Sequence, residues 1–185
     1  MKSLPLPPPS YVVAGGFDDI GDLEDNAQHW NLNLRQVERG PFRAELLQFG
    51  LAGIHLGEAR FSRALVQEGV APTGLRTIAV PACSEMRLVW RGRDVGQDSL
   101  MVFPQGGELS SVSDSDFHVF TCSFPEEILE DIAVSMGARG WLRFGAGGEA
   151  IRCSPTTKTR VRSCSRELRA IVRSDHRLLR DQRFE

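Results

Sequence analysis

Apolar and polar residues alternate in short segments along most of the chain between Asn33 and Phe124. Successive side chains of a β-strand point to opposite faces, so this period of two predicts strands. Glycines and the pair Gly40-Pro41 separate the segments, as hairpin turns do. The predicted strands are Asn33–Arg39, Phe42–Phe49, Ala52–Leu56, Ala59–Val66, Leu75–Val80, Glu85–Arg91, Leu100–Phe103 and Asp116–Phe124. Short strands in this number are typical of an antiparallel barrel or a double-sheet jelly roll.

Helical patterns flank this strand-rich region. Before it, Phe17 to Trp30 is polar and acidic, which predicts a short helix capped by Asp22. After it, Ser123 and Glu126 stand at the spacing of a capping box, and a helical apolar period then runs to Gly137. The predicted fold class is α+β, mainly β: an antiparallel barrel followed by C-terminal helices.

A second C-terminal helix is predicted beyond a glycine-rich linker. Its apolar positions follow the a/d spacing of a heptad; they are Val161, Cys164, Leu168 and Ile171. This seam would join two copies of the chain, or else the helix packs on its own barrel. The chain thus divides into a flexible Pro-rich arm (1–16), a barrel (17–124) and a helical dimerisation and linker region (125–185).

Composition narrows the class of protein. With 41% hydrophobic and 25% charged residues in 185, the chain is typical of soluble globular proteins. The net charge is −2, yet residues 155–185 hold nine basic side chains against four acidic ones, so the rest of the chain is acidic. No run approaches the roughly 20 apolar residues of a membrane span. The scattered cysteines (Cys83, Cys122, Cys153 and Cys164) suggest reduced thiols and a cytoplasmic protein.

Motifs for metal binding or catalysis are missing from the sequence. More than ten residues separate each of His29, His55, His118 and His176 from the next, whereas a metal-binding barrel needs clustered ligands. Glu58 follows His55 closely, but we expect Gly57 to turn the chain between them. We therefore predict no metal and no cofactor. The sequence also contains no nucleophile elbow and no phosphate-binding loop.

Several segments resemble the N-terminal sensor domains of AraC-type transcriptional regulators. These are the polar helix leading to Trp30, Gln36–Arg43 (QVERGPFR), Val89–Gly92 (VWRG), Phe103–Glu108 (FPQGGE) and the helix Ser123–Met136. The resemblance implies a metal-free, cupin-like barrel that binds a small-molecule effector, forms a homodimer and catalyses nothing. In that family two helix-turn-helix units follow and bind DNA. They are absent here, so we expect a fragment cut before the DNA-binding half, or a natural truncation.

An effector would lie among the inward-facing side chains of such a barrel. Trp30 and Trp90 are candidates for its apolar walls, and Gln36, Arg43 and His55 for its polar anchors. Structural roles are the alternative: Trp90 as plain core, Gln36 bonding a backbone edge, Arg43 facing water. A buried Arg43 would favour a ligand with a carboxylate or phosphate.

Two other functions fit the same sequence. One is a metal-independent cupin-like enzyme, such as an isomerase, acting on a small polar metabolite. The other is an interaction module whose barrel is filled. A pocket with two titratable groups within hydrogen-bond reach would favour the enzyme, and an apolar pocket with a polar anchor would favour the sensor.

Overall fold

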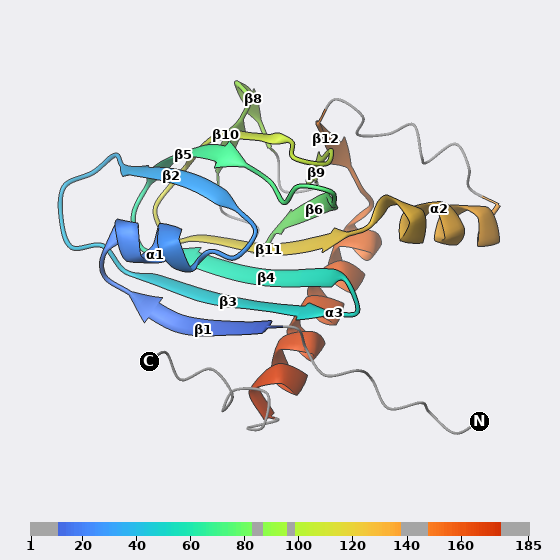
Figure 1. Cartoon of the computed structure of the whole chain (residues 1–185). Coiled ribbons are helices and arrows are strands. Elements are labelled where there is room, and N and C mark those ends of the chain that lie inside the picture. Colours follow the sequence, from blue (N-terminus) through green and yellow to red (C-terminus); the bar gives the residue numbers. More distant parts are fainter. Residues whose placement is uncertain (1–10, 83–86, 96–98, 138–147, 175–185) are drawn as a thin grey trace.

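Two antiparallel sheets face each other and form the body of the protein (Figure 1). The computed structural model describes residues 11–82, 87–95, 99–137 and 148–174. Within them, one sheet is ordered β1 (Tyr11–Phe17), β3 (Ala44–Leu51), β4 (Ile54–Phe61), β11 (Phe117–Phe124), β6 (Arg76–Pro81), β9 (Ser99–Phe103) and β12 (Glu149–Arg152). The other is ordered β2 (Asn31–Gln36), β5 (Leu65–Val70), β10 (Glu108–Ser113), β7 (Leu88–Trp90) and β8 (Arg93–Asp94). The predicted mainly β, double-sheet fold is confirmed.

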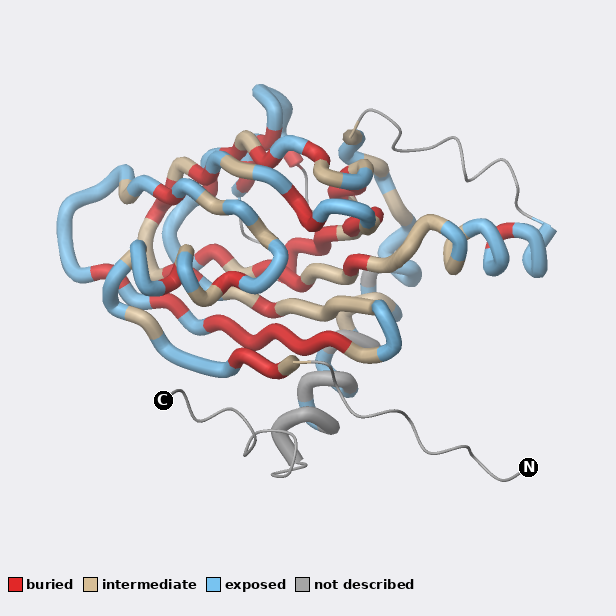
Figure 2. The backbone as a smooth tube through the Cα atoms, viewed as in Figure 1, coloured by how far each residue is buried: buried red, intermediate tan, exposed pale blue. Residues whose placement is uncertain are grey.

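The main core fills the space between the two sheets, as the buried inner positions of the strands show (Figure 2). Leu65 from β5 and Phe103 from β9 are 0% and 1% exposed, so each sheet contributes to it. Burial of an apolar side chain of this size stabilises the fold by roughly 1.5–3 kcal/mol. The alternation of apolar and polar residues therefore sets which face of each strand lies inside.

The strand β4 runs straight through Gly57, so the turn predicted there is wrong. Gly57 pairs with Gln48 of β3 on one side and with Thr121 of β11 on the other. A Cβ atom on Gly57 would lie 2.5 Å from Thr121 Oγ1. Glycine thus leaves room for the side chains of its neighbours. The hairpin turn lies earlier, at Ala52 and Gly53, whose φ angles are 50° and 80°.

Helix α1 (Ile20–Asn26) confirms the predicted short helix, but its cap is Asp19 and not Asp22. Asp19 has extended backbone angles, and its carboxylate accepts hydrogen bonds from the N–H groups of Gly21 and Asp22. These donors have no partner within the helix, which is why an acid at this position caps it. Leu23 on the inner side of α1 is 1% exposed, so the helix closes part of the barrel between β1 and β2 (Figure 1).

Helix α2 (Glu126–Ser135) begins and ends close to the predicted positions, but the capping box is wrong. Ser123 belongs to β11, where its hydroxyl bonds that of Thr77 at 2.7 Å, and the N-cap is Pro125, which makes no side-chain hydrogen bond. Arg76 of β6 holds the helix instead, with two hydrogen bonds of 2.7 and 2.8 Å to the Glu126 carboxylate. Figure 1 shows α2 projecting away from the barrel.

The predicted division of the chain differs from the structure at both ends of the barrel. Residues 11–16, assigned to the flexible arm, pair with β3 as most of β1, and residues 1–10 lie outside the described part. Residues 149–152, assigned to the helical region, form β12 and extend the sheet beside β9. Both segments therefore belong to the barrel.

Helix α3 (Pro155–Ser174) confirms the second C-terminal helix. Its Arg162 donates hydrogen bonds of 2.9 and 2.7 Å to the carbonyl of Pro81, which ties the helix to β6. Of the predicted heptad seam, Val161 is half-buried; the side chains of Cys164, Leu168 and Ile171 lie outside the described part. None of the helices in the described ranges combines the length and the apolar character needed to cross a membrane.

Candidate ligand-binding site

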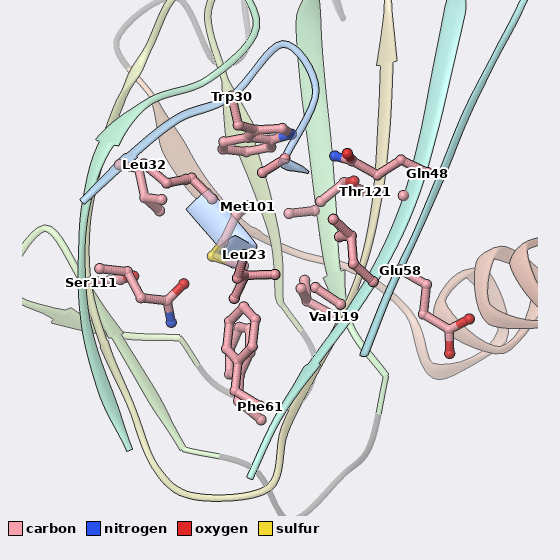
Figure 3. A pocket seen from close by; sticks show the side chains of 18 of the residues that line it. Leu23, Trp30, Leu32, Gln48, Glu58, Phe61, Met101, Ser111, Val119 and Thr121 are labelled. Carbon is pink, nitrogen blue, oxygen red and sulfur yellow. The ribbon is translucent and has the colours of Figure 1, made fainter. Parts of the chain in front are cut away.

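A cavity of about 80 Å³ lies inside the barrel, between the two sheets (Figure 3). Most of its wall is apolar, and strands of both sheets contribute to it together with α1 and the segment before β2. Its larger wall residues include Leu46, Phe61, Met101, Phe103 and Phe117. Trp30 bounds the cavity on one side, and its ring meets that of Phe103 edge-on at 5.8 Å. A concave, mostly apolar space with a few polar groups is typical of a small-molecule site.

Two uncharged polar pairs interrupt the apolar wall on opposite sheets. Gln48 and Thr121 come from β3 and β11 and lie close together in Figure 3, on either side of Gly57. Gln67 and Ser111 are direct cross-strand partners on β5 and β10. A ligand in the cavity would therefore meet amide or hydroxyl groups at both sheets.

Gln67 is an uncharged polar wall residue with an unmet hydrogen-bond donor. The residue is 6% exposed, and its Nε2 has no hydrogen-bond partner among the residues that the structure describes. Gln48, by contrast, uses its Oε1 to accept the backbone N–H of Gln28 at 2.8 Å. A buried donor without a partner costs about 1–3 kcal/mol of stability. A ligand atom that accepts a hydrogen bond from Gln67 would remove this cost.

The charged groups near the cavity point away from it. Glu58 is the ionisable residue in the wall within the described ranges, and Figure 3 shows its carboxylate directed outward. On the outer face of the sheet that carboxylate lies 2.8 Å from His118 Nε2 and 3.4 Å from Arg60. The interior is therefore uncharged.

Of the two predicted tryptophan walls, Trp30 lines the cavity and Trp90 does not. Trp90 is 3% exposed and packs behind the wall, with its ring centroid 4.6 Å from that of Phe103. It shares a cross-strand row with Ser111 and Gln67, and within the described part of the chain its Nε1 also has no hydrogen-bond partner. Trp90 is thus part of the core directly next to the site.

The three predicted polar anchors do not line the internal cavity. The amide of Gln36 donates to the backbone carbonyls of Glu38 and Gly40, which holds the loop after β2. Arg43 is exposed beside an open outer hollow of about 740 Å³, whose wall also holds Asp18 and Glu45. Since Arg43 is not buried, the condition that favoured an anionic ligand is not met.

The third anchor, His55, belongs to a cluster of rings outside the cavity wall. Its Nδ1 lies 3.1 Å from the hydroxyl of Tyr11, and its ring centroid lies 4.2 Å from that of His29. Burial lowers the pKa of His55, and the charge of His29 lowers it further. Burial raises the pKa of Tyr11 to about 12. In the described residues no group of three or more histidine, cysteine or acidic side chains is placed to hold a metal.

Sequence reasoning missed the four uncharged polar wall residues, although the alternation contained a signal for them. Each lies two positions after an apolar residue that faces inward, and therefore on the same face of its strand. These pairs are Leu46 and Gln48, Leu65 and Gln67, Leu109 and Ser111, and Val119 and Thr121. A polar residue in phase with the core positions marks the wall of an internal site.

Comparisons with known proteins show likeness of fold. No protein-family model matches the chain, and no curated protein matches it. Among solved structures, the AraC-like transcriptional activator CuxR matches with 15% identity and a TM-score of 0.45, over 68% of this chain and 52% of that one. Vicilin from hazelnut (Corylus avellana) matches with 11% identity and a TM-score of 0.34, over 83% of this chain and 52% of that one.

A deletion mutant of oxalate decarboxylase from Bacillus subtilis is also similar, with 16% identity and a TM-score of 0.30, over 63% of this chain and 38% of that one. This chain thus spans about half, or less, of each of these three chains. At identities this low the likeness concerns the fold alone.

Proposed function

We propose that this chain is the effector-sensing and dimerisation domain of an AraC-type transcriptional regulator in the cytoplasm. A small molecule binds inside the barrel, and the chain catalyses nothing. DNA binding resides in a helix-turn-helix half outside this chain. The observation that carries the proposal is the internal cavity, with its apolar wall and its uncharged polar groups.

Effector binding would act on the segments that close the barrel. Trp30 lies in the wall, directly between α1 and β2, and the nearby loop is tied to β3 by the Gln28–Gln48 hydrogen bond. A ligand that prefers one arrangement of this segment shifts the population toward that arrangement. The shift would reach an attached DNA-binding half through the helices that follow β11.

The alternative function is a metal-independent, cupin-like enzyme such as an isomerase. The observation in its favour is the contact of 2.8 Å between Glu58 and His118, two titratable groups within hydrogen-bond reach. These groups lie on the outer face of the sheet, with Arg60 beside them, and not in the cavity. A substrate would therefore have to bind outside the barrel, which is why the sensor is preferred.

The reading frame beyond the codon for Glu185 tests the regulator proposal. We expect an open frame of about a hundred residues with two helix-turn-helix patterns, as two such units require. A stop codon at that point would contradict the regulator and favour a free-standing ligand-binding barrel or an enzyme.

A further inference from the structure

The electrostatics of the cavity restrict the charge of its ligand. No arginine, lysine or histidine lies in its wall within the described ranges, and the carboxylate of Glu58 is directed to the other face of the sheet. An ion buried without a partner of opposite charge pays a large desolvation cost. The outer hollow contains Arg43 and Arg60, but the carboxylates of Asp18, Glu45 and Asp116 in the same wall offset their positive charge, so it offers no better anion site. The cavity therefore favours an uncharged molecule.

The hydrogen-bonding groups of the cavity restrict the ligand further. Gln67 Nε2 is a buried donor without a partner, and Ser111 lies directly across from it on β10. A ligand that brings an acceptor oxygen to this position removes the penalty of the unmet donor, whereas a hydrocarbon of the same shape leaves it in place. A site built in this way discriminates strongly against analogues that lack the matching polar atom.

We infer that the cavity accepts a small uncharged molecule with a hydrogen-bond acceptor oxygen. This inference rests on the proposed function, in which the cavity is the effector site. A ketone, ester, lactone or ether has this chemistry. The oxygen accepts a hydrogen bond from Gln67 Nε2, and the carbon skeleton packs against Trp30 and Phe103.

The size of the cavity sets the scale of this molecule. At about 80 Å³ it has roughly half the volume of an engineered cavity that holds benzene, which corresponds to roughly three non-hydrogen atoms in the cavity as it stands. Met101 in the wall has a flexible, unbranched side chain, so a somewhat larger skeleton is accommodated when it changes rotamer.

Three probes with equal numbers of non-hydrogen atoms test the inference: cyclobutanone, methylenecyclobutane and propionate. Methylenecyclobutane is cyclobutanone with the carbonyl oxygen replaced by a methylene group. Propionate is an anion. Binding is measured by NMR titration of the ¹⁵N-labelled chain, with the side-chain amide of Gln67 assigned from its loss in Gln67→Leu. We expect cyclobutanone to shift this amide and to bind about fivefold to tenfold more tightly than methylenecyclobutane, with propionate the weakest.

Variants separate the hydrogen bond from general packing. In Gln67→Leu the preference for cyclobutanone over methylenecyclobutane should disappear, because the donor is gone and the shape is largely kept. Gln105→Leu makes the same change at an exposed position and should keep the preference. Should Gln67→Leu fail to fold, the ratio of the two affinities measured on the wild type still decides the matter.

Equal binding of the two neutral probes, tightest binding of propionate, or no shift at Gln67 with any probe would overturn the inference. These outcomes concern the chemistry of the cavity and leave the reading-frame test of the regulator untouched. Conversely, a stop codon after Glu185 together with the expected probe preference would remove the regulator and keep the neutral-ligand site.

Discussion

At the scale of single residues, Tyr11 gives the ring cluster a direct spectroscopic probe because it is the only tyrosine in the sequence. Burial raises its pKa to about 12 from the usual 10. We predict that phenolate absorbance appears about two pH units later in the folded protein than in the urea-unfolded chain. Titration near pH 10 in the folded state would contradict the half-buried position of the ring.

The same shift has a consequence for stability. Between pH 10 and about 12 the unfolded chain binds fewer protons than the folded one, so the free energy of unfolding must fall as the pH rises through this range. Tyr11→Phe lacks the phenol and should show a smaller alkaline loss, measured by urea unfolding followed through tryptophan fluorescence.

Residue type alone predicted part of the site. Aromatic residues often line pockets, and on that basis Trp30 and Trp90 were both predicted as wall residues; Trp30 lines the cavity and Trp90 does not. Arginine and histidine attracted attention as anchors because of their chemistry, yet Arg43 and His55 lie outside the cavity wall. The unmet donor of Gln67 could not be predicted, because a missing partner is a property of the packed structure and not of the sequence.

At the scale of elements, Gly69 controls the pairing of β5 with β2. A Cβ atom at Gly69 would lie 1.9 Å from the carbonyl oxygen of Asn31, and its φ is +145°. At Gly74 φ is also positive, at +75°, but a Cβ atom there would have no other atom within 4 Å. Alanine variants at these two positions therefore distinguish the cost of a steric clash from the cost of backbone strain alone.

We predict that Gly69→Ala lowers the free energy of unfolding by about 3 kcal/mol and Gly74→Ala by about 1 kcal/mol. Urea unfolding measures both. Because β2 begins directly after Trp30, Gly69→Ala should also disturb the cavity wall, visible as a change in tryptophan fluorescence. Equal losses in the two variants would show that the contact with Asn31 does not limit the pairing.

The elements that sequence reasoning recovered are those with a strong apolar period, such as β11 and the two C-terminal helices. Strand β10 was missed because its inward positions are Leu109, Ser111 and Ser113, and two of the three are polar. Strand β4 was predicted as two segments because glycine is common in turns and Gly57 was taken for one. Both errors arise where the barrel wall carries polar or absent side chains, which is at or next to the cavity.

At the scale of the whole molecule, dimerisation through α3 is the part of the proposal that rests on the heptad spacing alone. Leu168→Glu places a charge in the predicted seam and should weaken the dimer in sedimentation velocity experiments. Ala170→Glu adds the same group at an exposed position of α3 and should leave it intact. A dimer equally stable in both variants would place the interface elsewhere.

The central claim is that the barrel holds an effector in its internal cavity, and a thermal-shift screen of small metabolites on a cavity-filled variant tests it most directly. Ala79 lines the cavity and is 2% exposed, so Ala79→Leu adds its extra carbon atoms to a space of about 80 Å³. Ala150→Leu makes the same change at an exposed position of β12 and is the matched control. Circular dichroism establishes that both variants fold.

A metabolite that binds the native cavity but not the unfolded chain stabilises the folded state, and the melting temperature rises with the logarithm of the ligand concentration above its Kd. We predict that uncharged metabolites in the screen raise the melting temperatures of the wild type and of Ala150→Leu by several degrees, and that they leave the melting temperature of Ala79→Leu unchanged. Stabilisation of all three proteins alike would place the ligand outside the barrel, and a screen without any such compound would contradict the sensor.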